Sequence, residues 1–306
     1  MLTSVGMNWK RKVNETVGEL TGFHFSRVTH PAGGPEPQRT ARRESQRAAA
    51  VAADQVRPPV HPEADRLVQP VFLLSPVRSG STLLRVILNA HSQIHAPHEL
   101  HLRRLTVGFG TTLAEQAMDA LGHNRADLEH LLWDRVLHRE LTLSGKKIIV
   151  DKTPANAFAF ERLTACWPGA RFVFLLRHPV SIATSWHEAS PGKRDAEAAA
   201  VDALRYMKAV ERARKALDGL TVRYEDVTAE PEQETRRICD FLGVPWEEEM
   251  LDYGARNDYR KGLGDWKDKI RSGAIQTGRE LPDPDAVPDV LKDISAAWGY
   301  LPVGSR

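Results

Sequence analysis

Residues 71–85, VFLLSPVRSGSTLLR, run from an apolar segment through a short polar loop into an amphipathic segment. A strand, a loop and a helix in this order are typical of a phosphate-binding site, because the loop N–H groups form a concave nest and the helix N-terminus adds a partial positive charge. A nucleotide-hydrolysing P-loop would need glycine at position 75 and lysine at position 81. The chain has Ser75 and Ser81 there, and its cation is Arg78. The loop is therefore predicted to bind an anionic nucleotide without Mg-ATP chemistry.

The composition is that of an ordinary globular protein of 306 residues, long enough for one or two domains. The net charge of +2 gives no electrostatic reason to expect nucleic-acid binding. The two cysteines, Cys166 and Cys239, fit neither a metal site nor a disulfide framework, so a reducing, cytoplasmic environment is the simplest interpretation. Residues 1–12 lack the apolar core of a signal peptide, and no apolar run approaches the roughly 20 residues of a membrane span.

Residues 1–64 differ in composition from the rest of the chain. They contain a Pro/Gly-rich stretch at 31–37, a run rich in Ala, Arg, Glu and Gln at 39–53, and three further prolines at 57–62. Because such segments bury little apolar surface, a loosely ordered N-terminal extension is predicted for residues 1–64. Residues 65–306 are predicted to form the folded domain.

From residue 67 onward, short apolar runs alternate with segments of helical period. The predicted strands are 71–74, 147–150, 171–176 and 221–224. The predicted helices are 81–90, 112–121, 126–141, 155–166, 179–189, 195–217 and 232–242. Strands that alternate with helices indicate an α/β fold, with a P-loop-like parallel β-sheet flanked by helices on both faces.

Arg177 and Ser185 form a second candidate site. Arg177 follows the apolar run 172–176, and Ser185 lies inside the next predicted helix. Because α/β folds bind ligands at the carboxyl ends of parallel strands, Arg177 is placed to pair with a phosphate through its forked N–H groups. Ser185 is placed to donate its hydroxyl to the same phosphate. The alternative is a surface arginine that pairs with a carboxylate.

Two further segments carry charged residues that could face the same cleft. The loop RKGLGDWK at 260–267 places the cations Arg260 and Lys261 beside Gly262, whose backbone can approach an anion closely. Lys152 follows the predicted strand 147–150, and Glu99 lies in the segment PHEL at 97–100. In a shared cleft, Lys152 would act as an electrophilic cation and Glu99 as a general base. The alternative for residues 260–267 is a solvated charged loop. The alternative for Lys152 is a surface lysine, and for Glu99 a helix-capping glutamate.

Taken in chain order, these segments resemble motifs of the sulfotransferase family that uses 3′-phosphoadenosine 5′-phosphosulfate (PAPS). Residues 78–82, RSGST, are similar to its 5′-phosphosulfate loop, and Arg177 and Ser185 have the spacing of its 3′-phosphate motif. The loop at 260–267 is similar to the motif RKGxxGDWK, with one residue fewer between the glycines. The segment VRYED at 222–226 resembles a family segment whose tyrosine, here Tyr224, lies near the adenine.

This resemblance implies how PAPS is bound. The residues implied for the phosphosulfate are Arg78, Ser79, Gly80, Ser81 and Thr82. The residues implied for the 3′-phosphate and the adenine are Arg177, Ser185, Tyr224, Arg260, Lys261 and Gly262.

One departure from the family pattern bears on the catalytic base. The small-molecule enzymes of the family carry Lys-Thr-His-Leu-Pro, in which the histidine is the base, whereas this chain has Lys152 followed by Thr-Pro. Its segment 97–100 instead resembles the bacterial and glycan-type branches, in which a glutamate after the first helix is the base. Glu99 is therefore the predicted base, and His98 is the alternative because its ordinary pKa would suit the role.

A local cluster of histidines comprises His91, His95, His98 and His101. Pro97 interrupts any helix through the cluster, and the sequence is not His-Glu-x-x-His, so no metal site is predicted. The cluster is placed at the rim of the substrate site.

The resemblance implies transfer of a sulfuryl group from PAPS to a hydroxyl of a carbohydrate or secondary metabolite, with a sulfate ester and PAP as products. Glu99 would take the proton, and Lys152 and Arg78 would stabilise charge on the transferred group. The alternatives are a P-loop kinase-like phosphotransferase, which the absence of lysine at position 81 disfavours, and a non-catalytic nucleotide- or glycan-binding module. The partners implied are a small-molecule or glycan acceptor; nothing in the sequence indicates the oligomeric state.

Overall fold

The computed structural model describes residues 67, 69–189, 192, 195–253, 275 and 280–302. All of them belong to one compact unit of the chain, Ala53–Arg306. The predicted N-terminal extension at 1–64 and the predicted anion loop with Arg260, Lys261 and Gly262 lie outside the described residues.

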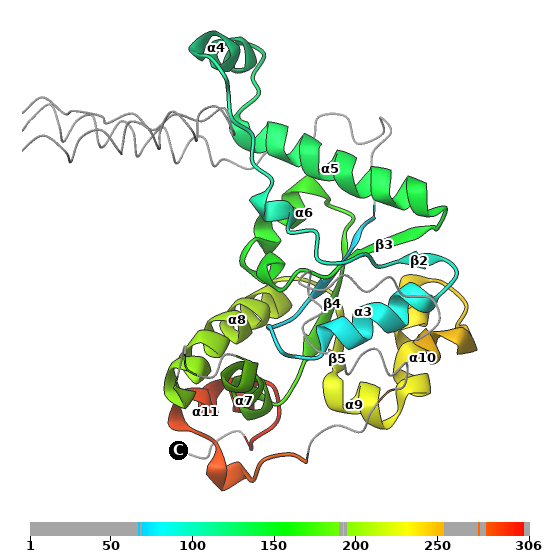
Figure 1. Ribbon diagram of the computed structural model, residues 1–306. Helices are drawn as coiled ribbons and strands as arrows, with labels where there is room; N and C mark the ends of the chain where they lie inside the picture. The colour runs from blue at the N-terminus through cyan, green and yellow to red at the C-terminus, as the bar shows by residue number, and fades with distance from the viewer. Residues whose placement is uncertain are drawn as a thin grey trace, which may run out of the picture. The chain divides into compact units, whose positions relative to one another are not determined.

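The described residues contain a parallel sheet of five strands in the order β2-β3-β1-β4-β5 (Figure 1). The strands are β1 (Val71–Leu74), β2 (Ile94–His95), β3 (Ile148–Asp151), β4 (Arg171–Leu176) and β5 (Leu220–Arg223). From β1 the chain builds the β2-β3 side of the sheet first and then crosses over to β4 and β5. Connections on opposite sides of β1 diverge at its carboxyl end, and such a point in an α/β sheet leaves a crevice for a ligand. The predicted α/β class with a parallel sheet is confirmed.

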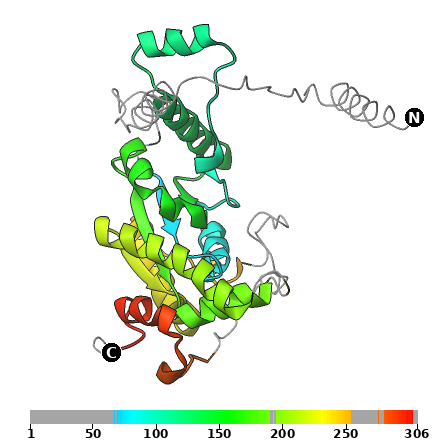
Figure 2. The ribbon, with the colours of Figure 1, turned by 90° about the vertical axis from the view of Figure 1, so that its left-hand side faces the viewer.

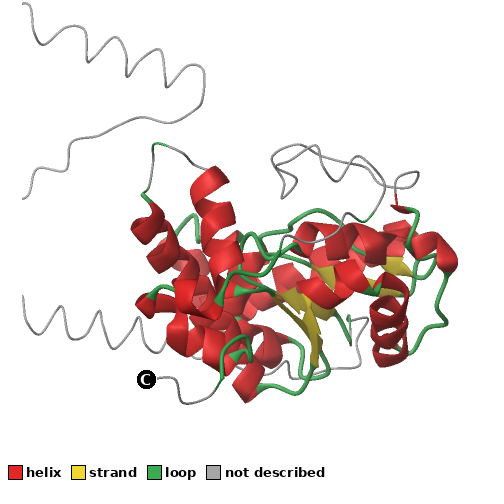
Figure 3. Ribbon diagram, turned by 90° about the horizontal axis from the view of Figure 1, so that it is seen from below, coloured by secondary structure: helices red, strands yellow, loops and turns green. Residues whose placement is uncertain are grey.

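Helices cover both faces of the sheet (Figure 3). Because successive side chains of a strand point to opposite faces, Val71 and Leu73 of β1 pack on one side, and Phe72 and Leu74 pack on the other. The first side carries α3 (Ser81–Ala90), α9 (Tyr224–Ala229) and α10 (Pro231–Leu242). The second side carries α5 (Arg125–Ser144), α6 (Phe160–Cys166), α7 (Pro179–Ala189), α8 (Ala196–Ala216) and α11 (Asp289–Ala297). The near-continuous apolar strands in the sequence follow from this double coverage.

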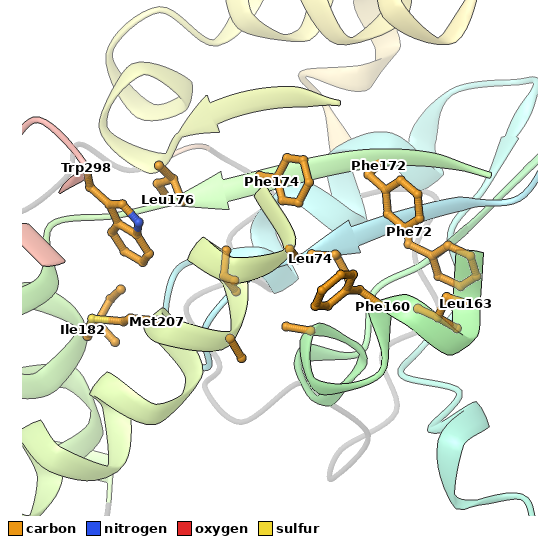
Figure 4. Packing of buried hydrophobic residues seen from close by; sticks show 14 of the residues in the cluster. Phe72, Leu74, Phe160, Leu163, Phe172, Phe174, Leu176, Ile182, Met207 and Trp298 are labelled. Carbon is orange, nitrogen blue, oxygen red and sulfur yellow. The ribbon is translucent and has the colours of Figure 1, made fainter. Parts of the chain in front are cut away.

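A row of aromatic side chains anchors the two central strands that lead into the candidate site (Figure 4). The ring centroids of Phe72 and Phe172 are 5.9 Å apart, and those of Phe172 and Phe174 are 6.5 Å apart. Phe72 also contacts Trp167 at 5.4 Å. Each buried phenylalanine contributes about 2–3 kcal/mol through the area it removes from water. The ends of β1 and β4 are therefore held rigidly by the core.

One predicted helix, 155–166, is wrong as a single element. The structure has a 3-10 helix, η2 (Pro154–Phe158), followed by α6, with Ala159 between them at φ −130°. The side chain of Asn156 donates to the buried carboxylate of Asp151 at 2.8 Å, which draws this first turn toward the end of β3. The break in the helical pattern therefore coincides with a local hydrogen bond from the 3-10 helix back to the end of β3.

Several short elements were not predicted. They are β2, α9, α11 and the 3-10 helices η1 (Leu102–Arg104), η3 (Glu248–Met250) and η6 (Pro284–Ala286). Tyr224, predicted at the end of a strand, instead begins α9. The helix α4 (Thr112–Ala120) was predicted but buries none of its residues, and Figure 2 shows it standing away from the sheet. Within the described part of the chain, no helix combines the length and apolarity that crossing a membrane requires.

The side chain of Lys146 ties the end of α3 to β2. Its Nζ donates to the carbonyl oxygens of Asn89, His91 and Ile94 at 2.8, 2.9 and 2.8 Å. Carbonyl groups in the last turn of a helix lack partners within the helix, and a lysine there also interacts favourably with the helix dipole. The contact fixes the segment that continues from β2 toward Glu99.

We expect Lys146→Met to lower the free energy of unfolding by about 2 kcal/mol, because three carbonyl oxygens lose a charged donor while the aliphatic stem keeps its packing. For a domain of this size, the melting temperature would fall by about 4–8 °C. Thermal unfolding of the purified variants measures the effect. Lys147→Met, at the exposed neighbouring lysine, is the matched control, and equal melting temperatures for the two variants would contradict the prediction.

Candidate active site

The loop between β1 and α3 presents an uncapped helix N-terminus. Gly80 is the N-cap residue at φ 89°, no described side chain caps this end, and the first turn carries no acidic residue. The leading N–H groups of α3 therefore keep their partial positive charge. This is the geometry predicted from the sequence for an anion site.

Two hydroxyl groups in this loop are buried. Ser75 and Ser79 are both fully buried, and neither Oγ has a hydrogen-bond partner among the described residues. A buried hydroxyl without a partner loses its bonds to water and is unfavourable by about 1–3 kcal/mol. Phosphate oxygens are acceptors that could satisfy Ser79 in this position, so the loop fits an anionic group.

Tyr224 closes one side of the loop. A Cβ atom added at Gly80 would lie 2.2 Å from Cδ2 of Tyr224, so only glycine allows the ring to approach this closely. The guanidinium of Arg177 stacks on the same ring, 4.2 Å from its centroid. Arg177 comes from the end of β4, as predicted, and its Nη1 donates to the carbonyl oxygen of Arg78 at 3.1 Å.

Arg78 connects this group to α7. Its Nε donates to Oγ of Ser185 at 3.2 Å, and its backbone adopts a left-handed conformation with φ 64°. Ser185 is buried on α7. The structure therefore brings five predicted residues together around the loop: Arg78, Gly80, Arg177, Ser185 and Tyr224. The guanidinium groups of Arg78 and Arg177 and the hydroxyl of Ser185, which are gathered here, are groups that pair well with phosphate oxygens.

Lys152 and Glu99 form an ion pair on the other side of the same loop. Nζ of Lys152 lies 2.6 Å from Oε1 of Glu99 and donates to Oγ1 of Thr82 at 3.4 Å. The lysine side chain is 1% exposed and the glutamate side chain 14% exposed. Lys152 therefore links the carboxylate of Glu99 to the first turn of α3, which joins three elements of the predicted site.

His101 contacts the second oxygen of the same carboxylate. Its Nε2 lies 3.5 Å from Oε2 of Glu99, and its side chain is 48% exposed. The sequence placed His101 in a rim cluster and did not predict a contact with Glu99. A histidine two residues from a candidate base was a signal available for this contact, although spacing alone does not bring two side chains together.

Asp151 is a functional candidate that the sequence reasoning missed. It ends β3, is buried, and accepts hydrogen bonds from Oγ1 of Thr153 and Nδ2 of Asn156, both at 2.8 Å. Burial raises the pKa of Asp151, and the hydrogen bonds from Asn156 and Thr153 oppose that rise. An acidic residue directly before a lysine at a strand end was the available signal.

Among the described residues, no group of three or more His, Cys, Asp or Glu side chains is arranged to hold a metal ion. The histidine cluster includes His95, whose pKa is lowered by burial and by Lys146, while Glu140 opposes that shift.

The chain belongs to the sulfotransferase family, whose profile matches residues 70–248. That range contains both groups of side chains around the loop. The family resemblance drawn from the four sequence motifs is confirmed.

Two relatives are similar in sequence to parts of this chain. Nodulation protein NoeE of Sinorhizobium fredii is 32% identical over 125 residues, which cover 37% of this chain and 30% of that protein. An uncharacterized protein of Aquifex aeolicus is 26% identical over 210 residues, which cover 60% of this chain and 27% of that protein. The chain thus spans less than a third of the length of these relatives.

Two solved structures have a similar fold. The sulfotransferase domain from the Synechococcus PCC 7002 olefin synthase has a TM-score of 0.58 and 21% identity, covering 81% of this chain and 99% of that domain. The sulfotransferase domain from the curacin biosynthetic pathway has a TM-score of 0.55 and 24% identity, covering 77% of this chain and 99% of that domain. The α/β sulfotransferase fold is therefore shown.

Proposed function

We propose that this chain transfers a sulfuryl group from PAPS to a hydroxyl group of an acceptor, giving a sulfate ester and PAP. One observation carries the proposal. Lys152 contacts both the carboxylate of Glu99 and the hydroxyl of Thr82 in the phosphate loop. A candidate base, a cation and an anion-binding loop are thereby joined, and family membership supplies the reaction class.

The proposal assigns the 3′-phosphate of the nucleotide to residues beside the loop before α3. Arg177 and Ser185 would bind the 3′-phosphate, since both contact Arg78 and neither lies in the phosphate loop. Tyr224, already stacked with Arg177, would lie beside the adenine. The contact between Arg78 and Ser185 supports a role for Arg78 in nucleotide binding. The catalytic role of Arg78 stays a prediction. The roles of Arg260, Lys261 and Gly262 also stay predictions, because these residues lie outside the described part of the chain.

The sulfuryl group is transferred in a single displacement at sulfur. A bond forms from the acceptor oxygen to sulfur, the bond from sulfur to the bridging phosphate oxygen breaks, and that oxygen keeps the electron pair. Glu99 takes the proton of the acceptor hydroxyl. The N–H groups at the start of α3 and the cation of Lys152 stabilise the developing negative charge, so positioning and electrostatics provide most of the catalysis.

The ion pair between Lys152 and Glu99 couples the two ends of this displacement. Lys152 is almost completely buried, and a buried ammonium needs a neighbouring anion. When Glu99 accepts the proton, its carboxylate becomes neutral and the attraction that holds Lys152 weakens. The leaving oxygen gains negative charge in the same step, so Lys152 gains a new partner as it loses the old one. The site can therefore move the proton and stabilise the leaving group together.

We infer a carbohydrate or a secondary metabolite as the acceptor, in agreement with the resemblance of segment 97–100. Three half-buried rings support an acceptor with a flat or apolar face. The ring centroids of Phe158 and Tyr206 are 4.8 Å apart, and those of Tyr206 and Trp186 are 5.7 Å apart. Phe158 ends the 3-10 helix that follows Lys152, and Trp186 follows Ser185 on α7. A cytoplasmic location stays a prediction.

The test compares nucleotides and then measures transfer. PAP at about 100 times its dissociation constant should stabilise the protein by about 2.7 kcal/mol, and Mg-ATP at the same concentration by less. Labelled PAPS, incubated with panels of sugars and phenolic metabolites, should yield a labelled ester. Arg177→Ala should weaken PAP binding by about 30-fold, since it removes charged hydrogen bonds, whereas Arg212→Ala on the exposed face of α8 should leave PAP binding unchanged. Greater stabilisation by Mg-ATP than by PAP would favour a phosphotransferase instead.

A further inference from the structure

The backbone that carries Glu99 is held by the residues around Lys152. The N–H of His101 donates to Oγ1 of Thr153 at 3.2 Å, and the backbone of Leu100 helps to oppose the rise in the pKa of Asp151 that burial causes. Lys152 itself holds the carboxylate of Glu99. Lys152 and Thr153, the two residues that follow β3, thus bind Glu99 and His101 in the segment that contains the proposed base.

The hydrogen bonds between these two segments form a chain in which His101 donates to Thr153 and Thr153 donates to Asp151. Because Oγ1 of Thr153 accepts the N–H of His101, its single proton is available for Asp151, to which it donates at 2.8 Å. Asp151 also accepts from Asn156 at 2.8 Å. A deprotonated carboxylate only accepts hydrogen bonds, so it matches these donors, and hydrogen bonds to a charged group are stronger than neutral ones. The carboxylate therefore orders Thr153, and Thr153 orders His101.

The held segment needs this support. His101 adopts φ 50° and ψ 37°, a left-handed conformation that is unfavourable by about 1 kcal/mol for a residue other than glycine. Asp151 is 1% exposed and Thr153 is fully buried. Neither side chain is accessible to a hydroxyl acceptor, so any effect on the reaction must pass through their neighbours, which are Lys152 and the segment that contains Glu99.

We propose that Asp151 and Thr153 are positioning residues that fix Glu99 beside Lys152. They set the rate of transfer without contributing to nucleotide affinity, because the nucleotide group around Arg177 and Ser185 belongs to other elements. The inference rests on the proposed function of Glu99 as the base. Displacing a catalytic group by about 1 Å can reduce a rate by about 100-fold, so loss of the anchor has a measurable effect.

The experiment compares Thr153→Val with Thr153→Ser in the full chain. Valine keeps the size of threonine but removes the hydroxyl, and serine restores the hydroxyl. Thr153→Val should lower turnover of saturating PAPS by about 10–100-fold, with PAP affinity within about two-fold of wild type, and should speed hydrogen exchange at the His101 amide. Thr153→Ser should recover turnover and slow exchange. PAPS hydrolysis, with water as the acceptor, provides the turnover without knowledge of the natural acceptor.

Two results would overturn the inference. One is unchanged turnover in Thr153→Val; the other is a parallel loss of turnover and PAP affinity, which a general loss of structure produces. If Thr153→Val does not fold, Asp151→Asn and hydrogen exchange in the wild type replace it. Rapid exchange at the His101 amide in the wild type would also contradict the inference. Failure of the proposed function looks different, since the wild type would then neither bind PAP nor consume PAPS.

Discussion

Glu99→Gln is expected to reduce turnover of PAPS by about 10²–10⁴-fold while PAP binds as tightly as it does to the wild type. The glutamine amide cannot accept the proton of the acceptor hydroxyl at a useful rate. Nucleotide binding should survive, because Arg177, Ser185 and Tyr224 do not contact Glu99 in the hydrogen bonds and ring contacts of the described residues. Single-turnover transfer and calorimetric titration with PAP separate the two effects.

Glutamine is preferred to alanine for a structural reason. Lys152 lies 2.6 Å from the glutamate and is almost completely buried. Alanine would leave this ammonium without its partner, and breaking a buried pair in this way destabilises a protein by about 3–5 kcal/mol. Glutamine retains an oxygen that accepts the hydrogen bond from Lys152. A change in turnover without a large change in melting temperature can then be assigned to the chemistry.

Glu140→Gln is the matched control for this variant. Glu140 is another carboxylate beside a histidine, with its Oε2 3.9 Å from Nε2 of His95, and it lies on α5. Loss of its charge should leave turnover within about two-fold of wild type, as is usual for a surface ion pair. Full activity in Glu99→Gln would show that another group takes the proton, and His98 would then be the first residue to replace.

The parts of the fold that the sequence predicts well are those with local signals. The bounds of β1, α3, β4 and α7 agree with the predicted ranges residue for residue. Each strand is an apolar run, and each following helix begins at a turn signal, Gly80 before α3 and Pro179 at the start of α7. Since ligands bind at the carboxyl ends of parallel strands, the positions of Arg78 and Arg177 followed from the same pattern.

The parts that the sequence does not predict depend on contacts between distant residues. Nothing in segment 222–226 shows that Tyr224 would close the phosphate loop, since the reason is the missing side chain of Gly80. β2 has two residues, too few for a period of hydrophobicity to be recognised. His101 and Asp151, which were missed in the site, have partners nearby in the chain, but the sequence alone does not show which of these side chains meet.

Gly80→Ala is expected to reduce PAP affinity by about 100-fold. The new Cβ would lie 2.2 Å from Cδ2 and 2.5 Å from Cε2 of Tyr224, so the ring or the loop must move. Movement of the ring removes the stack with Arg177, and movement of the loop removes the carbonyl oxygen of Arg78 from Arg177. Either shift disturbs the arginine proposed to bind the 3′-phosphate. Calorimetric titration with PAP measures the loss.

A positive φ alone would also make alanine unfavourable at this position, so the clash needs its own control. Gly122 has φ 78°, close to the 89° of Gly80, but a Cβ added there meets nothing within 4 Å. Gly122→Ala should therefore show the backbone effect of about 1 kcal/mol on stability and no loss of PAP affinity. Equal PAP affinities for the two variants would mean that the clash between the new methyl group at position 80 and Tyr224 does not disturb the nucleotide site.

The double variant Gly80→Ala with Tyr224→Ala completes the test. Tyr224→Ala removes the ring that the new methyl group would strike, so Gly80→Ala should reduce PAP affinity much less in that background than in the wild type. Residues in contact are expected to show this kind of non-additivity, whereas independent residues add within about 0.5 kcal/mol. A full additional loss in the double variant would mean that Gly80 serves the nucleotide through its own backbone. The coupling energy between the two substitutions therefore shows whether the contact between Tyr224 and Gly80 matters for PAP binding.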